Sequence, residues 1–294
     1  MKLIVELTNK NLIKNYRNIN HVNYLVIGCN NLSLNASSCF SLSEIDEIYN
    51  LVKDTNLRLI LNCERLFSDN DLEYVKTLFD LGFFYKFEYI MYSDFGLKNL
   101  LETLDKSLKF IFKASTYLTN KYDVNLYNKL NDFVVLSSEI SSSELIELSK
   151  GVDKNVIVDV FGQSACFYSR RPLISNYFKY RGIDKDLSNN YHVIEELRSD
   201  LLPIIENETG TLILEPKHHV IVEEFKFLEN IAYGLISLHN LSMKKCLCVV
   251  KTYSDFIDDL NISKVYETFK DNNIDVYKGA YNIKSVLLKG GCNE

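Results

Sequence analysis

Residues 159–177 are the most informative part of the chain for chemistry. An apolar stretch, 156–161, runs into Gly162 and then into a polar loop. The polar residues of the loop include Gln163, Cys166, Tyr168, Ser169, Arg170, Arg171 and Asn176. Loops that follow strands often carry function, and adjacent arginines suit an anionic or planar ligand. The alternative is a structural turn held by a salt-bridged arginine.

A thiol nucleophile at Cys166 needs a neighbouring base to generate the thiolate. The loop holds no histidine. Arg170 and Arg171 can stabilise a thiolate but cannot accept a proton at neutral pH. We therefore expect Cys166 to be a semi-buried packing residue, with a catalytic thiol as the alternative.

Three carboxylates follow predicted strands: Glu64, Asp94 and Glu139. Strand ends can direct such groups into one pocket, where they exchange protons with a substrate. The alternatives for Glu139 are an ion pair with a nearby lysine or capping of the next helix. All three remain catalytic candidates beside Cys166.

The sequence predicts no metal site. Cys246 and Cys248 lie in a predicted helix, 245–258, where side chains two residues apart diverge. His218 and His219 are consecutive, so they face opposite sides of an extended segment.

Short apolar strands alternate with amphipathic helices along the chain. The predicted strands begin near residues 3, 24, 58, 86, 109, 132, 155 and 233. Ser41 with Glu44 and Ser141 with Glu144 fit capping boxes, and Ser68 begins another helix. Seven or eight such units without a glycine-rich nucleotide motif predict an α/β fold, a single-domain (β/α) TIM-type barrel.

The predicted domain spans residues 1–294. The regular spacing of the predicted strands is interrupted at 172–216. We assign this segment to an inserted loop and hairpin region between the last strand units, with a turn at 206–210. Residues 262–294 are assigned to a C-terminal extension.

In a barrel of this type, catalytic groups come from the carboxyl ends of the strands. The predicted ends are polar: Thr8, Cys29, Asn30, 62–64, Ser93, Asp94, Ser115, Thr116, 137–139 and 163–171. From them we select as ligand- or partner-binding candidates Asn62, Ser93, Ser115, Gln163, Tyr168, Ser169, Arg170 and Arg171, and we add Asn176 from the loop.

Composition limits the functional classes. The 294 residues carry a net charge of −6, so the chain as a whole does not attract nucleic acid, and an RNA contact needs a local basic patch or a basic partner. Seven irregularly spaced cysteines argue against a secreted disulfide framework. With no signal-peptide pattern or membrane-length apolar run, we expect a cytoplasmic protein without a membrane contact.

Residues 159–177 resemble the signature of peptidase family U32, the collagenase-like or PrtC-like proteins. The matching residues are Asp159, Val160, Phe161, Ala165, Cys166, Tyr168, Ser169, Arg171 and 173–177. Further segments that resemble the family are 61–62, 93–96, 115–116, 136–141, 208–214 and 278–289. The resemblance covers nearly the whole chain and implies a barrel.

The chain departs from larger members of the family in its cysteines, which are thought to hold an iron–sulfur cluster there. Pro172 occupies the second cysteine position, Gln163 stands where a histidine is usual, and 182–196 contains no cysteine. One thiolate, at Cys166, cannot hold a cluster that takes four. We therefore expect a short, cluster-poor bacterial member without a cofactor of its own.

The resemblance implies three alternative functions. Similar relatives are linked to prephenate-dependent 5-hydroxylation of transfer-RNA uridine, where small members accompany a longer, cysteine-rich paralogue. This favours an accessory subunit that meets tRNA through a complex. The family name implies a collagenase-like peptidase, although no nucleophile–base pair or metal motif is evident. A non-catalytic scaffold for the longer paralogue is the third alternative, so whether the chain is an enzyme stays open.

Overall fold

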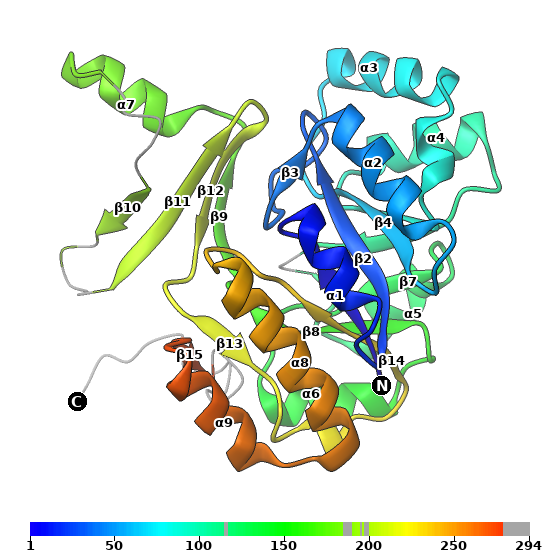
Figure 1. Ribbon diagram of the computed structural model, residues 1–294. Coiled ribbons are helices and arrows are strands. Elements are labelled where there is room, and N and C mark those ends of the chain that lie inside the picture. The colour runs from blue at the N-terminus through cyan, green and yellow to red at the C-terminus, as the bar shows by residue number, and fades with distance from the viewer. Residues whose placement is uncertain (115–116, 185–189, 195, 197–199, 279–294) are drawn as a thin grey trace.

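The computed structural model describes residues 1–294 except 115–116, 185–189, 195, 197–199 and 279–294. Parallel strands close into a ring with helices around it (Figure 1). In ring order they are β1 (Lys2–Glu6), β2 (Val22–Cys29), β4 (Arg58–Cys63), β5 (Tyr89–Tyr92), β6 (Phe110–Lys113), β7 (Phe133–Val135), β8 (Val156–Gly162) and β14 (Ile231–Ile236). Because β14 pairs in parallel with both β1 and β8, the predicted TIM-type barrel is confirmed.

The apolar interior of the barrel takes one residue from each strand. These residues are Ile4, Val26, Ile60, Met91, Ile111, Val135, Ile157 and Leu235. Toward the amino ends of the strands, Tyr24, Tyr89, Phe133 and Tyr233 form a ring of edge-to-face contacts, with centroids 5.4 to 5.6 Å apart. The interior is therefore filled, which leaves the carboxyl end of the barrel for chemistry.

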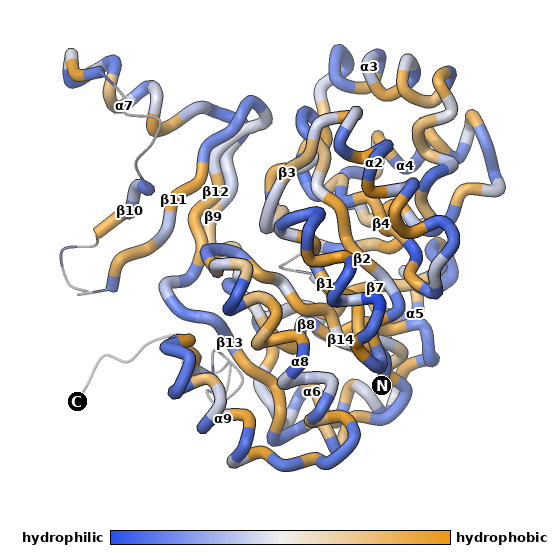
Figure 2. The backbone as a smooth tube through the Cα atoms, viewed as in Figure 1, coloured by the Kyte–Doolittle hydropathy of each residue, from blue (hydrophilic) through white to orange (hydrophobic). Residues whose placement is uncertain are grey.

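Helices cover the outside of the ring, and their apolar faces alternate with polar ones (Figure 2). They are α1 (Ile13–Tyr16), α2 (Leu42–Val52), α3 (Asp69–Asp80), α4 (Phe95–Leu104), α5 (Lys121–Asn128), α6 (Ser142–Lys150), α8 (Met243–Asp259) and α9 (Ile262–Asp271), with short 3-10 helices at Lys10–Leu12, Phe83–Lys86 and Phe225–Phe227. The predicted capping boxes at Ser41 and Ser141 are present, and Ser68 forms a third with Asp71. The strand expected from residue 86 begins later, because Phe83–Lys86 is helical.

None of the helices in the described part of the chain has both the length and the apolar character needed to cross a bilayer.

A second, antiparallel sheet stands beside the barrel (Figure 1). Its strands are β9 (Ala165–Ser169), β10 (Tyr191–Ile194), β11 (Leu201–Asn207) and β12 (Gly210–Leu214), in the order β10-β11-β12-β9. α7 (Leu173–Arg181) follows β9 and projects away from the barrel. We call the described residues of 165–214 the arm. The predicted turn at 206–210 is confirmed, since β11 and β12 pair as a hairpin around it.

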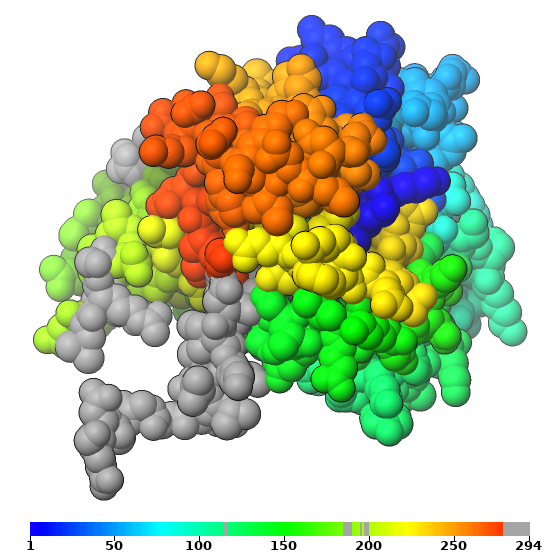
Figure 3. Space-filling model, turned by 90° about the horizontal axis from the view of Figure 1, so that it is seen from below, coloured from blue at the N-terminus to red at the C-terminus, as the bar shows by residue number. Residues whose placement is uncertain are grey.

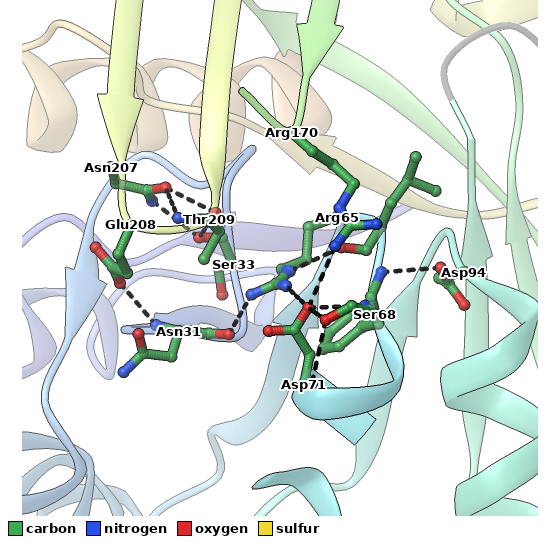
Figure 4. Close-up of polar contacts among 12 residues, drawn as sticks. Asn31, Ser33, Arg65, Ser68, Asp71, Asp94, Arg170, Asn207, Glu208 and Thr209 are labelled. Carbon is green, nitrogen blue, oxygen red and sulfur yellow. Dashed lines mark hydrogen bonds and ion pairs between the residues drawn. The ribbon is translucent and has the colours of Figure 1, made fainter. Parts of the chain in front are cut away.

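The arm is fixed to the loops that follow β2 and β4 (Figure 4). The Asn31 backbone N–H donates to Glu208 Oε1 at 2.8 Å. Arg65 donates to the Asn31 carbonyl at 2.6 Å and pairs with Asp71, also at 2.6 Å. The hairpin tip of the arm and the loops after the barrel strands therefore form one continuous rim.

After the arm, the chain returns to the barrel. β13 (His218–Val220) pairs with β8, and β15 (Val276–Tyr277) pairs with β13. β3 (Cys39–Phe40) pairs with the carboxyl end of β2. α8 and α9 lie on the face shown in Figure 3, and the arm protrudes from the left of that view. Of the predicted C-terminal extension, α9 and β15 are seen, and 279–294 lie outside the described residues.

Gly210 allows β12 to pair closely with β9. Its φ is +147°, and a Cβ atom there would lie 2.3 Å from the Ser169 carbonyl oxygen. We expect Gly210→Ala to destabilise the arm by about 1–3 kcal/mol through backbone strain and the clash. Limited proteolysis should then show faster cleavage within 165–214. Gly182→Ala also places an alanine at a positive φ, +64°, but no atom lies within 4 Å of the added Cβ, so this variant isolates the backbone strain and should have a smaller effect. Equal protection of Gly210→Ala and the parent chain would contradict this prediction.

Candidate functional site at the barrel mouth

A layer of polar side chains lies above the apolar interior of the barrel. Residues two places apart on a strand face the same side, so the second residue after each inward-facing apolar residue also faces inward. This rule selects Glu6, Gly28, Asn62, Ser93, Lys113, Ser137, Asp159 and Ser237. The carboxyl end of the barrel therefore gathers charged groups in a largely buried position.

Lys113, the last residue of β6, is the cation of this layer. Its Nζ lies 3.1 Å from Glu64 Oε2 and 3.9 Å from Asp159 Oδ2. The Asn35 amide donates to the other Glu64 oxygen, Oε1, at 2.7 Å. We use the name mouth cluster for Glu6, Glu64, Lys113, Asp159, His219 and His239.

The pKa shifts in the mouth cluster follow from burial and from the excess of carboxyl groups. Burial by itself lowers the pKa of Lys113, but Asp159, Glu64 and Glu6 together outweigh it, and the net shift of this pKa is upward. Burial raises the pKa of Glu64 and of Asp159, and Lys113 offsets only part of the rise. One ammonium group thus faces three carboxyl groups, which suits a hydrogen-bond-donating ligand better than an anionic one.

Two histidines enter the mouth cluster from β13 and from the loop after β14. His219 Nε2 donates to the Asp159 carbonyl at 3.1 Å, which leaves Nδ1 to accept from the Ser164 hydroxyl at 3.4 Å. His239 Nδ1 lies 4.0 Å from Glu6 Oε2. Burial lowers the pKa of both imidazoles to about 4, so both are neutral at pH 7. His219 is therefore a weak base toward Ser164.

A cavity of about 20 Å³ lies among these side chains and has room for roughly one water molecule. Asp159 and His239 line it. Within the described residues, the buried atoms Asp159 Oδ1 and His239 Nε2 make no hydrogen bond. Because unsatisfied buried polar atoms are costly, these two atoms are the points at which the mouth cluster can hold a ligand group.

A larger groove of about 580 Å³ lies between the arm and the C-terminal part of the barrel. Gln163 lines both spaces and therefore lies between them. Its amide donates to the Glu215 carbonyl at 2.9 Å and accepts from the Asn240 amide at 2.7 Å. His218 lines the groove and His219 the small cavity, so the predicted opposite orientation of these two histidines is confirmed.

Among the predicted catalytic residues, Glu64 lies in the mouth cluster. Asp94 instead caps α4, since its Oδ1 accepts from the backbone N–H groups of Gly96 and Leu97. Glu139 is exposed and does not cap α6, because Ser141 and Glu144 form that cap. Cys166 lies on the arm.

The predicted ligand-binding residues of the barrel support the loops around the mouth cluster. Asn62 accepts from the Glu64 backbone N–H at 2.8 Å and donates to the Asn35 carbonyl at 2.8 Å. The Ser93 hydroxyl donates to the Arg65 carbonyl at 3.3 Å. Ser115 lies outside the described residues.

The remaining predicted residues lie on the arm: Tyr168, Ser169, Arg170, Arg171 and Asn176. The Tyr168 hydroxyl accepts from the Leu66 backbone N–H at 3.2 Å, and Arg170 Nη2 lies 3.9 Å from Asp71 Oδ2. The Ser169 hydroxyl accepts from the Arg171 backbone N–H at 3.1 Å. The start of the arm thus shares the rim with the strand ends, whereas Asn176 is exposed on α7.

Sequence analysis missed Glu6, Lys113, Asp159, His219 and His239 as members of a site. A signal was present for Lys113 and Asp159, because a charged residue interrupts an apolar strand two places after a residue that must face the interior. The two histidines carried no such signal, since only the return of the chain after the arm brings them to the mouth.

The described cysteines do not fit a four-thiolate iron–sulfur site. Burial raises the pKa of the Cys29, Cys63 and Cys246 thiols, which opposes the thiolate form that metals bind. The prediction of a semi-buried Cys166 is wrong, because β9 is an edge strand of the arm and the thiol is exposed, donating to the Ile213 carbonyl at 3.3 Å. Within the described ranges, no three His, Cys, Asp or Glu side chains form a group that could hold a metal ion.

Comparison with known proteins gives a family, a relative and two similar structures. Peptidase family U32 matches residues 15–285. The tRNA hydroxylation protein P2 of Bacillus subtilis (strain 168) is 28% identical over 159 residues, which cover 51% of this chain and 52% of that protein. The matched region thus spans about half the length of this relative. The U32 peptidase Mk0906 aligns with a TM-score of 0.49 and 13% identity over 81% of this chain and 93% of that one. A chitinase from Chromobacterium violaceum aligns with a TM-score of 0.41 and 9% identity over 86% and 99% of the two chains.

Proposed function

The chain belongs to peptidase family U32, and from this premise we propose that it is an accessory subunit in prephenate-dependent 5-hydroxylation of transfer-RNA uridine. The observation that carries the proposal is the similarity to the tRNA hydroxylation protein P2. The reaction belongs in the cytoplasm, where transfer RNA is modified, and we place the protein there.

The arrangement of the mouth supports an accessory role. The buried thiols disfavour a cluster in this chain, so we assign the iron–sulfur cluster to a longer, cysteine-rich paralogue as partner. The mouth cluster offers one ammonium against three carboxyl groups, which disfavours a dianion such as prephenate. The cavity there holds about one water molecule, so a nucleobase does not fit without rearrangement.

The chemistry of a peptidase has less support. Cys166 lies on the arm, and Ser164 faces an imidazole whose pKa is lowered to about 4 by burial. A base of that pKa is poorly matched to activating a hydroxyl group at neutral pH. We therefore expect purified protein to leave gelatin and a peptide library uncleaved.

Deletion of the gene tests the proposed function. We expect the nucleosides derived from 5-hydroxyuridine to disappear from bulk transfer RNA, as measured by mass spectrometry. Restoring the gene should return them, and deletion of the cysteine-rich paralogue should remove them as well, because each subunit needs the other. Unchanged transfer RNA in the deletion strain would reject the proposal. Modification that survives loss of the paralogue would reject the accessory role alone.

A further inference from the structure

The start of the arm carries a cluster of cations, although the sequence of 165–214 as a whole holds six basic and seven acidic residues. Residues 165–183 contain Arg170, Arg171, Lys179 and Arg181 and no acidic residue, in a chain whose net charge is −6. The first acidic residue after this stretch is Asp184. All four cations belong to exposed residues. This is the local basic patch that an RNA contact requires in an acidic protein.

Aromatic rings stand among these cations on the outer surface. Tyr180 is 88% exposed, Tyr177 is 57% exposed, and Phe167 on β9 is 47% exposed. Other rings of the chain are also exposed, such as Tyr122 at 77%, but these three lie close in sequence to four cations. An exposed ring beside cations is a suitable surface for stacking an unpaired base.

The helical geometry of α7 makes two exposed rings and a cation neighbours on its surface. Ile174 and Phe178 are one turn apart and face the sheet, where Ile174 is buried and Phe178 contacts Tyr191 at 5.1 Å between ring centroids. Tyr177, Tyr180 and Arg181 follow at positions i, i+3 and i+4, so Tyr177 neighbours both of the others, and all three are exposed along the side of α7 next to the Ile174 and Phe178 stripe. α7 projects from the end of the arm, clear of the barrel (Figure 1).

We propose that the exposed face of α7, with Arg170 and Arg171 beside it, is an RNA-binding surface that stacks unpaired bases of a loop on Tyr177 and Tyr180 while the cations contact phosphates. The inference rests on the proposed function and names the part of this chain that meets the RNA. Unpaired bases stack on aromatic side chains without strict sequence preference, and single-stranded loops are the usual targets of such surfaces. The arm would hold the loop on the rim that it shares with the strand ends of the barrel.

Binding of two RNA probes to the full chain tests this surface. One probe is a stem–loop whose loop contains unpaired uridines, and the other is the fully paired stem. In fluorescence anisotropy, the double variant Tyr177→Ala/Tyr180→Ala should bind the stem–loop at least about tenfold more weakly, whereas Tyr177→Phe/Tyr180→Phe should stay close to the parent chain. Tyr122→Ala is the matched control, since Tyr122 is 77% exposed but lies on α5 of the barrel. Arg181→Gln should weaken both probes and lower the slope of log Kd against log salt by about 1.

Three results would overturn the proposal. They are unchanged stem–loop binding by the alanine double variant, an equal loss on the paired stem, and a parent chain that binds neither RNA probe. Failure of this inference is distinguishable from failure of the proposed function. A deletion strain with unchanged transfer RNA rejects the function and leaves the binding result standing. An alanine double variant that restores modification fully and binds the stem–loop normally rejects the surface alone.

Discussion

Lys113→Met is expected to destabilise the protein by about 3–5 kcal/mol, because it leaves buried carboxyl groups without their counter-charge. Lys113 Nζ lies 3.1 Å from Glu64 Oε2 and 3.9 Å from Asp159 Oδ2, and its side chain is only 8% exposed. Urea denaturation at neutral pH measures the loss of unfolding free energy. The loss should shrink at acidic pH, since protonation of Glu64 and Asp159 removes the charges that Lys113 compensates.

Lys98→Met provides the matched control for this variant. The Lys98 side chain is also 8% exposed, but its partner Glu102, at 2.6 Å, is 50% exposed on the helix surface. Water can solvate Glu102 when Lys98 is removed, so we expect a loss below about 1 kcal/mol. Adding Glu64→Gln to Lys113→Met should recover part of the stability. Similar losses of unfolding free energy for the two lysine variants would contradict the argument that the carboxyl groups of the mouth cluster are shielded from water.

Unfolding free energy should fall as pH drops from about 6.5 toward 4, because three histidines are buried in the neutral form. Burial lowers the pKa of His218, His219 and His239 to about 4 from an ordinary value of 6.5. Between these values the unfolded chain binds more protons than the folded chain, so stability is present above pH 6.5 and is lost as pH falls. Each histidine contributes about 2 kcal/mol of loss between pH 7 and pH 5.

Glu64 and Asp159 oppose this trend, so the histidine contribution is best measured by difference. Burial raises the pKa of both carboxyl groups, and the folded state therefore gains protons, and stability, on acidification. His218→Gln removes a group that stacks on Phe161 at 5.1 Å and donates to the His239 carbonyl at 2.9 Å. In this variant, the decrease in unfolding free energy between pH 7 and pH 5 should be smaller than in the parent chain by about 2 kcal/mol. His192→Gln, exposed on β10, should leave that change intact, and an equal effect of both variants would contradict the argument.

The sequence by itself determined the barrel, because its signals are local and repeated. Strand periodicity, helix caps at Ser41 and Ser141 and the hairpin turn at 206–210 depend on neighbours within a few residues, and the structure confirms them. The same signals gave the carboxyl ends of the strands as the place for chemistry. They also marked Glu64, which does lie in the mouth cluster.

Tertiary structure alone decided which polar groups meet. Lys113 and Asp159 are 46 residues apart in the sequence, and the pairing of β6 with β7 and of β7 with β8 in the curved sheet makes them neighbours. His219 reaches the mouth because β13 pairs with β8 after the arm, a non-local contact that leaves no mark on the surrounding residues. The inward or outward direction of a strand residue depends on the register of the whole ring, and a slip of one residue reverses it. For that reason a pattern of residue types could locate the rim but could not select the side chains that face one another across it.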